Sequence, residues 1–524
     1  LPSARQRGAP GEPRALFALP APRWPVECEV IKETIEHIEW VPPEPEPFCP
    51  PAAPEQVPAP RGQEQGAVVY HLSPAPLAGP QDTTLLFESR FESGNLQKAV
   101  KVGPFEYVLT LRPDLYTAKH TQWFYFRVQN TRRDHLYRFT IANLAKPKSL
   151  YGEGMCPLLY SQRDAESRGI GWRRAGADVR YYRGGGSGEE PVAFRLSWTV
   201  RFPHDGDSCF FAPSYPYTYS DLQRYLRALA GDPVRSRYCA VRALCRSLAG
   251  NTVYLLTITS PAGAAAKRVV VLSARVHPGE SGGSWAMRGF LDFLLGTHAD
   301  ARLLRRLFVF KVVPMLNPDG VVVGNSRCSL AGRDPNRAYG TAHRGSFPGV
   351  WHLRALVERV LAEREVVLYC DFHGHSRKNN VFMYGCDGGG ADTRLRLRQR
   401  VFPLMLSKNA PDKFSFPSCK FKVQKSKAGT GRVVMWRMGV SNSYTLEVAF
   451  GGSTLGGRSS HFTVKDLMAL GYHLGDTLLD FCDPDPAKFQ QCLAEVDALL
   501  RRRLGQELGA GGSWSDISPS ELES

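Results

Sequence analysis

An apolar segment that ends in a histidine and a glutamate is the feature that most constrains the fold of this chain. Residues 268–276, RVVVLSARV, predict a strand buried on both faces, and HPGE follows at 277–280. From Trp285 onward the apolar residues recur with helical spacing. A strand, a polar turn and a helix are typical of an open α/β sheet, where ligands bind at the carboxyl ends of the strands. His277 and Glu280 could therefore bind one cation, although such a pair alone is more often an ordinary surface turn.

The whole chain divides into four parts by composition and residue pattern. Its 524 residues exceed one usual domain, and a hydrophobic fraction of 43% is typical of a globular protein. Residues 1–80 are rich in proline and predict an extended arm, and residues 501–524 predict an acidic, disordered tail. Short β-branched and aromatic runs in residues 81–215 predict an antiparallel β-sandwich domain. In residues 216–500 strand and helix patterns alternate, which predicts an α/β domain with a mixed β-sheet flanked by helices.

The charge balance predicts an anionic partner. A net charge of +16 would attract nucleic acid, an acidic membrane surface or an acidic peptide. We find no zinc-finger spacing, no RNA-binding aromatic motif and no basic helix, so nucleic acid stays a secondary hypothesis. No apolar run approaches the roughly 20 residues that span a bilayer, so we expect no membrane partner. Charge alone does not choose among these partners, and a solvated basic surface is the simplest alternative.

The cysteines predict a reducing compartment. All twelve occur singly, without a CxxC pair, from Cys28 to Cys492. In a chain of this size such scattered residues are expected to be reduced thiols, most of them buried, rather than a disulfide framework. We therefore expect a cytoplasmic protein.

A second strand pattern also ends in histidine. Residues 366–376, VVLYCDFHGHS, pass from apolar residues into His373 and His375. With His277 and Glu280, one more histidine would complete a His, Glu, His set whose fourth position is left for water, as in catalytic zinc sites. We prefer His373 because it lies nearer the strand end, and expect His375 to be an outer or surface group. Neighbouring Asp371 either orients a ligand or forms a buried hydrogen bond.

A general base and a set of anion-binding groups complete the predicted site. Glu447 lies inside the strand pattern of residues 444–450, where an ionised carboxylate is costly unless a partner compensates it. A water bound at the metal is one such partner, and an interstrand salt bridge is the alternative. Between the histidine segments, the polar loop at residues 315–340 offers arginines and asparagines for a substrate carboxylate and a developing oxyanion.

Taken together, these motifs resemble those of the M14 metallocarboxypeptidases. HPGE, NPDGVVVGNSRCSLAGRDPNR (317–337), DFHGHS (371–376) and YTLEVAF (444–450) occur in that order. The segments NSRCSLAGRD, FAPSYPYTYSDL and KAGTGR are similar to those of the cytosolic carboxypeptidase subfamily. The resemblance implies a zinc carboxypeptidase domain preceded by a β-sandwich, with one Zn²⁺ per chain. It assigns the metal to three ligands and general acid/base action to a fourth residue, namely His277, Glu280, His373 and Glu447.

The resemblance also implies roles for the residues that would bind substrate. Arg327 would polarise the scissile carbonyl, and Asn336 and Arg337 would bind the terminal carboxylate. Asp334 would hold His277 from outside the metal shell. Arg432 falls where the family sets its side-chain pocket, and a cation there suits a terminal Glu or Asp.

The function that follows is a zinc exopeptidase that removes C-terminal or side-chain glutamates from polyglutamylated proteins. The resemblance implies acidic tubulin tails as partners, a monomeric enzyme, and a place in the cytosol at microtubules, centrioles or the cilium base. One feature departs from the digestive enzymes, because no tyrosine precedes Glu447 at the expected loop position and Tyr444 is too close to replace it. Two alternatives are a noncatalytic binder of acidic tails or microtubules and an aspartoacylase-like amidohydrolase.

Overall fold

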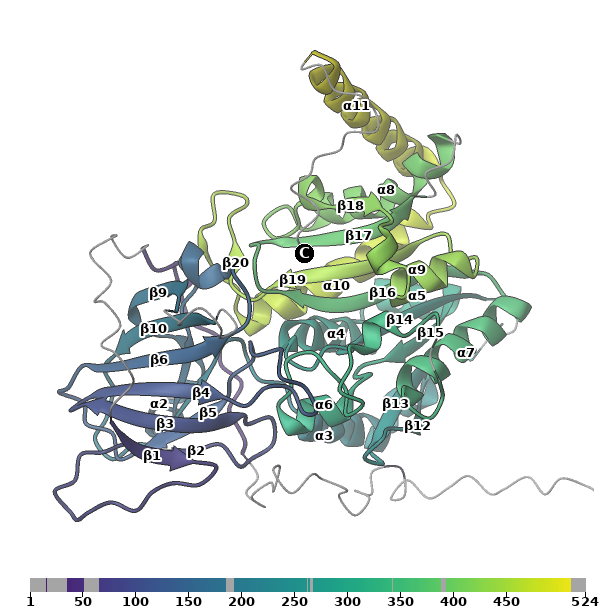
Figure 1. Ribbon diagram of the computed structural model, residues 1–524. Coiled ribbons are helices and arrows are strands. Elements are labelled where there is room, and N and C mark those ends of the chain that lie inside the picture. Colours follow the sequence, from purple (N-terminus) through teal and green to yellow (C-terminus); the bar gives the residue numbers. More distant parts are fainter. Residues whose placement is uncertain are drawn as a thin grey trace, which may run out of the picture.

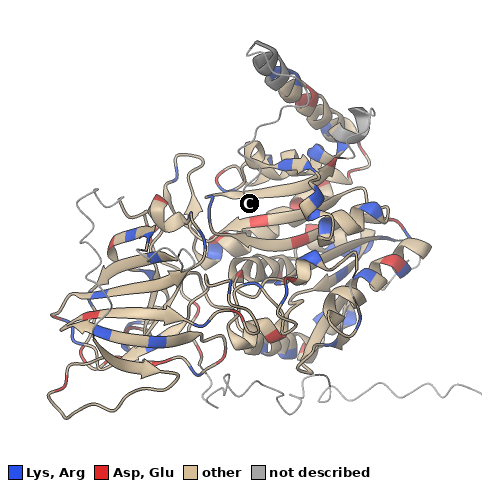
Figure 2. Cartoon of the chain, viewed as in Figure 1, with Lys and Arg blue, Asp and Glu red and all other residues tan. Residues whose placement is uncertain are grey.

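The computed structural model describes two packed parts, a β-sandwich and an α/β domain (Figure 1). The sandwich, drawn in purple and blue, lies beside the larger domain, drawn in teal to yellow. Lys and Arg are spread over both parts and are interspersed with Asp and Glu (Figure 2). The described residues are Leu16, 35–50, 66–184, 193–261, 263, 267–341, 343–387 and 393–509.

The sandwich consists of a six-stranded and a five-stranded sheet. Its strand pairs are antiparallel except for β4 and β6, which run parallel. The first sheet has the order β1 (Ala67–His71), β3 (Leu96–Gly103), β4 (Glu106–Leu111), β6 (Tyr137–Leu144), β10 (Phe194–Val200) and β9 (Ala177–Arg183). The second has the order β2 (Leu86–Glu88), β5 (Phe126–Gln129), β11 (Cys209–Ala212), β7 (Leu158–Ser161) and β8 (Arg173–Arg174), and helix α2 spans Gln162–Arg168. Strand β1 belongs to the first sheet although it precedes the expected boundary at residue 81.

Aromatic rings fill the space between the two sheets. Phe139 of β6 lies with its ring centroid 5.3 Å from that of Phe211 in β11 and 6.5 Å from that of Phe126 in β5. Trp198 of β10 lies 5.8 Å from Phe211. These side chains are fully buried, so the alternating pattern of the sequence produces one apolar core.

The α/β domain is built on a mixed eight-stranded sheet, as expected. Four adjacent central strands, β15, β14, β16 and β19, run parallel. Strands β12, β13 and β17 are antiparallel to their inner neighbours. The order is β12 (Cys239–Arg246), β13 (Thr252–Ile258), β15 (Phe308–Val313), β14 (Arg268–Ala274), β16 (Val366–His375), β19 (Ser443–Ala449), β17 (Val381–Asp387) and β18 (Lys420–Lys422). A small ribbon pairs β20 (Gly452–Ser453) with β21 (Ser460–His461).

Helices cover both faces of this sheet. Val270 and Leu272 of β14 share a core with α4 and α10, whereas Val269 and Val271 share another with α7 and α9. This explains the continuous apolar run, because each face of β14 is buried. The helices are α3 (Tyr219–Gly231), α4 (Ser281–Leu294), α5 (Ala299–Leu307), α6 (Pro318–Val323), α7 (Pro348–Glu363), α8 (Thr393–Asn409), α9 (Gly431–Arg437), α10 (Val464–Phe481) and α11 (Ala487–Gly509). Short 3-10 turns span Leu150–Glu153, Arg235–Arg237, Pro335–Arg337, Phe416–Ser418 and Lys425–Lys427.

The last described helix, α11, extends from the α/β domain. Helix α11 packs on α8 and projects away from the body, and it continues to Gly509, beyond the expected start of the tail at 501 (Figure 1). No described helix combines the length and apolarity that crossing a membrane requires.

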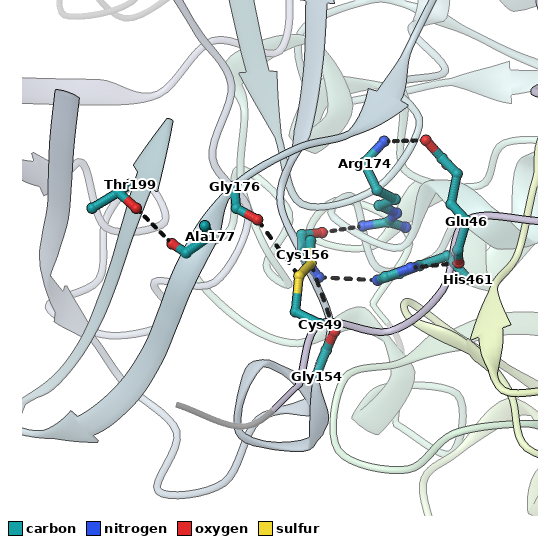
Figure 3. The surroundings of a disulfide bond; sticks show 9 residues. All are labelled: Glu46, Cys49, Gly154, Cys156, Arg174, Gly176, Ala177, Thr199 and His461. Carbon is teal, nitrogen blue, oxygen red and sulfur yellow. Dashed lines mark hydrogen bonds between the residues drawn. A yellow bond between two sulfur atoms is a disulfide. The ribbon is translucent and has the colours of Figure 1, made fainter. Parts of the chain in front are cut away.

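The cysteine expectation is wrong for one pair. Cys49 and Cys156 form a disulfide that ties residues 46–49 to the sandwich (Figure 3). The same segment contacts both domains. The Arg174 N–H of the sandwich donates to the Glu46 side-chain carboxylate at 2.7 Å, and the His461 N–H of the α/β domain donates to the Glu46 backbone carbonyl at 2.8 Å. The other nine described cysteines are free. A separation of 107 residues gives no local spacing that could have indicated this bond.

Candidate active site

Three of the predicted ligands converge at the carboxyl ends of two neighbouring strands. His277 follows β14, Glu280 precedes α4, and His373 lies near the end of β16, which pairs in parallel with β14. The Glu280 oxygens lie 2.9 Å from His277 Nδ1 and 3.1 Å from His373 Nδ1. One ligand atom from each residue lies within 4.8 Å of the others. This geometry brings together two imidazoles and a carboxylate, which is a zinc-type donor set.

Carboxylates outside the cluster fix the orientation of both histidine rings. His277 Nε2 lies 2.9 Å from Asp334 Oδ1, and His373 Nε2 lies 2.6 Å from Asp371 Oδ2. If each Nε2 donates its hydrogen to its carboxylate, both Nδ1 lone pairs face Glu280, and the two Nδ1 atoms are 3.2 Å apart. Two lone pairs and a carboxylate repel one another unless a cation lies among them, so the residues present fit a metal ion.

The Glu280 carboxylate stays ionised although it is partly buried. Burial alone would favour the protonated form, but the positive charge that His277 and His373 carry when protonated holds the pKa of Glu280 well below its usual range. The backbone N–H of Gly374 also donates to Glu280 Oε2 at 2.9 Å. An ionised carboxylate is the form that binds a metal.

Glu447 lies on the strand next to His373 but outside the ligand cluster. In the parallel pairing of β16 and β19, His373 is directly opposite Glu447. Burial raises the pKa of Glu447 to about 7. Among the described residues its carboxylate has no hydrogen bond or salt bridge, which disfavours the interstrand salt bridge considered above. A half-buried carboxylate with a pKa near neutrality is suited to accept and return a proton.

Asp334 connects His277 to the predicted oxyanion-binding arginine. Its Oδ2 accepts a hydrogen bond from Arg327 Nε at 2.9 Å and forms an ion pair with Arg327 Nη2 at 2.7 Å, while its Oδ1 faces His277. Arg337 Nη1 lies 3.6 Å from the same Oδ2. Burial opposes the charge of Asp334, but His277 and these arginines hold its pKa well below the usual range. Asp334 therefore holds Arg327 beside His277 and the candidate ligand set, on the loop that the sequence indicated.

The predicted substrate groups Asn336 and Arg432 are joined through α9. Asn336 Oδ1 accepts a hydrogen bond from the Gly431 N–H at 3.0 Å. The side-chain NH₂ of Asn336 takes no part in this bond. Arg432 is 6% exposed, and its Nη1 donates to the Gly385 carbonyl. Its buried Nε has no hydrogen-bond partner within the described part of the chain. A buried cation with an unsatisfied donor is suited to bind an anion.

One residue that sequence reasoning missed comes from the sandwich. Asp114 is 2% exposed and accepts hydrogen bonds from three consecutive backbone N–H groups, those of Ser326 at 2.5 Å, Arg327 at 2.7 Å and Cys328 at 2.6 Å. The sandwich therefore holds the loop that carries Arg327. More than two hundred residues separate Asp114 from this loop, and no local pattern marked it.

Two other residues discussed from the sequence lie outside the cluster. His375 Nδ1 accepts a hydrogen bond from the Lys378 N–H at 3.0 Å, and its ring packs on Phe382. Tyr444 is fully buried and donates its hydroxyl hydrogen to the Gln399 carbonyl at 2.8 Å. Tyr444 is therefore not placed to close over a substrate.

Comparison with known proteins agrees with this architecture. Residues 222–455 match the family described as zinc carboxypeptidase, and residues 87–174 match the cytosolic carboxypeptidase N-terminal domain. Cytosolic carboxypeptidase 2 of Danio rerio is 57% identical over 97% of this chain and 76% of its own length. The chain belongs to the cytosolic carboxypeptidases. Its human relative, cytosolic carboxypeptidase 2, is 61% identical over 98% of this chain, which spans 61% of the human protein.

Solved structures of bacterial metallocarboxypeptidases share the fold of this cytosolic carboxypeptidase. The enzyme of Burkholderia cenocepacia has a TM-score of 0.63 at 23% identity, covering 76% of this chain and 99% of its own. The metallo-carboxypeptidase of Pseudomonas aeruginosa has a TM-score of 0.59 at 22% identity, covering 75% and 97%. Both coverages extend beyond the α/β domain, so the fold similarity includes part of the sandwich.

Proposed function

We propose that this chain is a zinc metallocarboxypeptidase that removes C-terminal or side-chain glutamates from polyglutamylated proteins, with acidic tubulin tails as its substrates. The observation that carries the proposal is the buried, incompletely paired guanidinium of Arg432, beside Asn336 and at the same sheet edge as the His, Glu, His cluster. The net charge of +16 favours acidic tails over neutral ones. A monomer in the cytosol, recruited to microtubules, centrioles or the cilium base, is the setting that we propose.

The chemistry follows from the positions of these groups. One zinc ion per chain, held by His277, Glu280 and His373, would supply Lewis acidity towards the scissile carbonyl and the attacking water. Glu447 takes a proton from that water and returns it to the leaving amine. Arg327 turns part of its guanidinium from Asp334 to the developing oxyanion.

The remaining groups position the terminal residue. Arg337 and the free amide of Asn336 bind the terminal carboxylate, and Arg432 binds the side-chain carboxylate of a terminal glutamate. Asp334 keeps His277 in the tautomer that presents Nδ1 to the metal. Every binding group is thus a donor directed at an acidic residue at the chain end.

The deciding experiment is mass spectrometry of a polyglutamate-tailed peptide incubated with the zinc-loaded protein, beside its Glu447→Gln variant. Stepwise loss of glutamate with the unsubstituted protein alone would support the proposal. Binding of the peptide without cleavage would favour the noncatalytic binder of acidic tails. Hydrolysis of N-acetylaspartate without release of glutamate from the peptide would favour the amidohydrolase.

A further inference from the structure

A lysine of the sandwich lies near the candidate metal ligands His277, Glu280 and His373. Lys146 follows β6, and its Nζ donates a hydrogen bond to Ser376 Oγ at 3.1 Å, three residues beyond His373. The Leu150 N–H donates to the Ser376 carbonyl at 2.9 Å, which anchors the same segment a second time. A cation of one domain is therefore fixed at the strand end that carries a proposed metal ligand of the other.

The charges of the site surround this ammonium group. The carboxylates of Glu280 and Glu447 attract the Lys146 ammonium group electrostatically, and the guanidinium groups of Arg327 and Arg377 repel it. Burial lowers the pKa of Lys146 to about 8, with the arginines acting in the same direction, so the group is mostly charged at neutral pH. Among the described residues this partly buried ammonium has one neutral side-chain acceptor, Ser376 Oγ, so it has donors left for an anion.

Two groups of cations approach Glu447 from different elements. Arg432 and Lys427 belong to α9 and the turn before it, where Asn336 is bonded to the Gly431 N–H. Lys146 approaches instead from the sandwich, beside Ser376. A carboxypeptidase places the terminal residue on one side of the scissile bond and the preceding residue on the other. If the α9 group takes the terminal residue, the sandwich side receives the residue before it.

We propose that Lys146 binds the carboxylate of an acidic residue on the N-terminal side of the scissile bond, so that the sandwich selects consecutive glutamates. The inference rests on the proposed function, since it requires that glutamate-terminated peptides are cleaved. It assigns the sandwich a part in substrate selection. Lys146 is a specificity-determining residue here, distinct from the groups that act on the reacting bond.

The test compares two peptides that both end in Glu and differ in the residue before it, Glu or Ala. We expect Lys146→Met to lower kcat/KM for the Glu-Glu peptide by about tenfold, the range of a hydrogen bond to a charged group, and to change that for the Ala-Glu peptide little. Lys146→Arg should restore most of the difference. Lys148→Met, on the exposed part of the same segment, is the matched control and should leave both values unchanged.

Each other outcome has a definite meaning. Equal losses on both peptides, or no loss on either, would overturn the role of Lys146 while leaving the carboxypeptidase intact. Absence of glutamate release by the unsubstituted protein would instead overturn the proposed function. In that case a binding measurement tests Lys146 separately. The affinities of the two peptides are compared for the Glu447→Gln protein and for the same protein with Lys146→Met added, which shows whether Lys146 binds the acidic residue. Lys146→Gln replaces Lys146→Met in every comparison if the latter fails to fold.

Discussion

The sandwich and the α/β domain bury different kinds of side chains. Between its sheets the sandwich buries aromatic rings such as Phe139, Phe211 and Trp198, which satisfy one another by packing. At its sheet edge the α/β domain buries His277, His373 and Asp371, and it partly buries Asp334. Such groups are costly to bury without a compensating charge. The first core is satisfied by its own packing, whereas the second cluster is a donor set that fits a cation.

The sandwich contributes to the site through residues at its boundary with the α/β domain. Asp114 and Lys146 both lie at the junction of the two parts, and both reach loops of the other domain that carry proposed site residues. Support and selection by the sandwich can therefore be separated experimentally from the chemistry of the α/β edge.

Removal of the metal should produce the largest difference between the two domains. We expect chelation to abolish activity and to lower the melting temperature, because Glu280, Asp334 and Asp371 then lose the cation that compensates them. Calorimetry with and without zinc, together with measured zinc content, checks this. His375→Ala, outside the cluster, should keep the full zinc response. An unchanged melting temperature on chelation would contradict the comparison.

Glu447→Gln should come next in magnitude. We expect turnover to fall by about 10²- to 10⁴-fold, the range for loss of a general base, with zinc content unchanged. Steady-state kinetics and metal analysis of the purified variant measure both quantities. Turnover at the unsubstituted rate would remove Glu447 from the mechanism.

Arg432→Ala should act on specificity. We expect kcat/KM for glutamate-terminated peptides to fall by about ten- to a hundredfold, because a charge-assisted contact is lost, and to change far less for peptides ending in a neutral residue. Arg437→Ala, at the end of the same helix, serves as the control. Equal losses for the two peptide classes would show that Arg432 acts on stability and not on the pocket.

Asp114→Asn tests the support that the sandwich gives to the Arg327 loop. A neutral amide cannot accept three N–H groups as a carboxylate does, so we expect kcat/KM to fall by about tenfold while zinc content stays constant. Asp134→Asn removes an exposed carboxylate of the same domain and should have no effect. If Asp114→Asn lowers zinc content as much as activity, the residue holds the whole fold and not the loop.

The pH dependence of the preference for Glu-Glu peptides should be the smallest effect. Burial lowers the pKa of Lys146 to about 8, so its charge is present below that pH and is lost as the pH rises through it. The ratio of kcat/KM for Glu-Glu and Ala-Glu peptides should therefore fall a few-fold between about pH 7 and pH 9. Arg432 remains charged over this range, so the preference for a terminal glutamate should persist. A constant ratio would mean that Lys146 does not bind the preceding residue.

Local patterns in the sequence were sufficient for much of the fold. The run at 268–276 and the histidine-ended run at 366–376 predicted strands, and the structure has β14 and β16 there, which lie next to each other in the sheet. Strand β12 and helix α5 went unpredicted. β12 is an edge strand with many exposed residues, so it has no continuous apolar run, and α5 has only nine residues, so its helical pattern covers few turns.

The sequence alone determined which residues are available for the chemistry, because polar residues directly after buried strands must meet at one edge of a parallel sheet. That reasoning placed His277, Glu280 and His373 together without any knowledge of distant contacts. Only the tertiary structure decided the Cys49–Cys156 bond and the positions of Asp114 and Lys146 at the site. These contacts join residues that are remote in the chain, and they depend on how two finished domains pack, which no local period encodes.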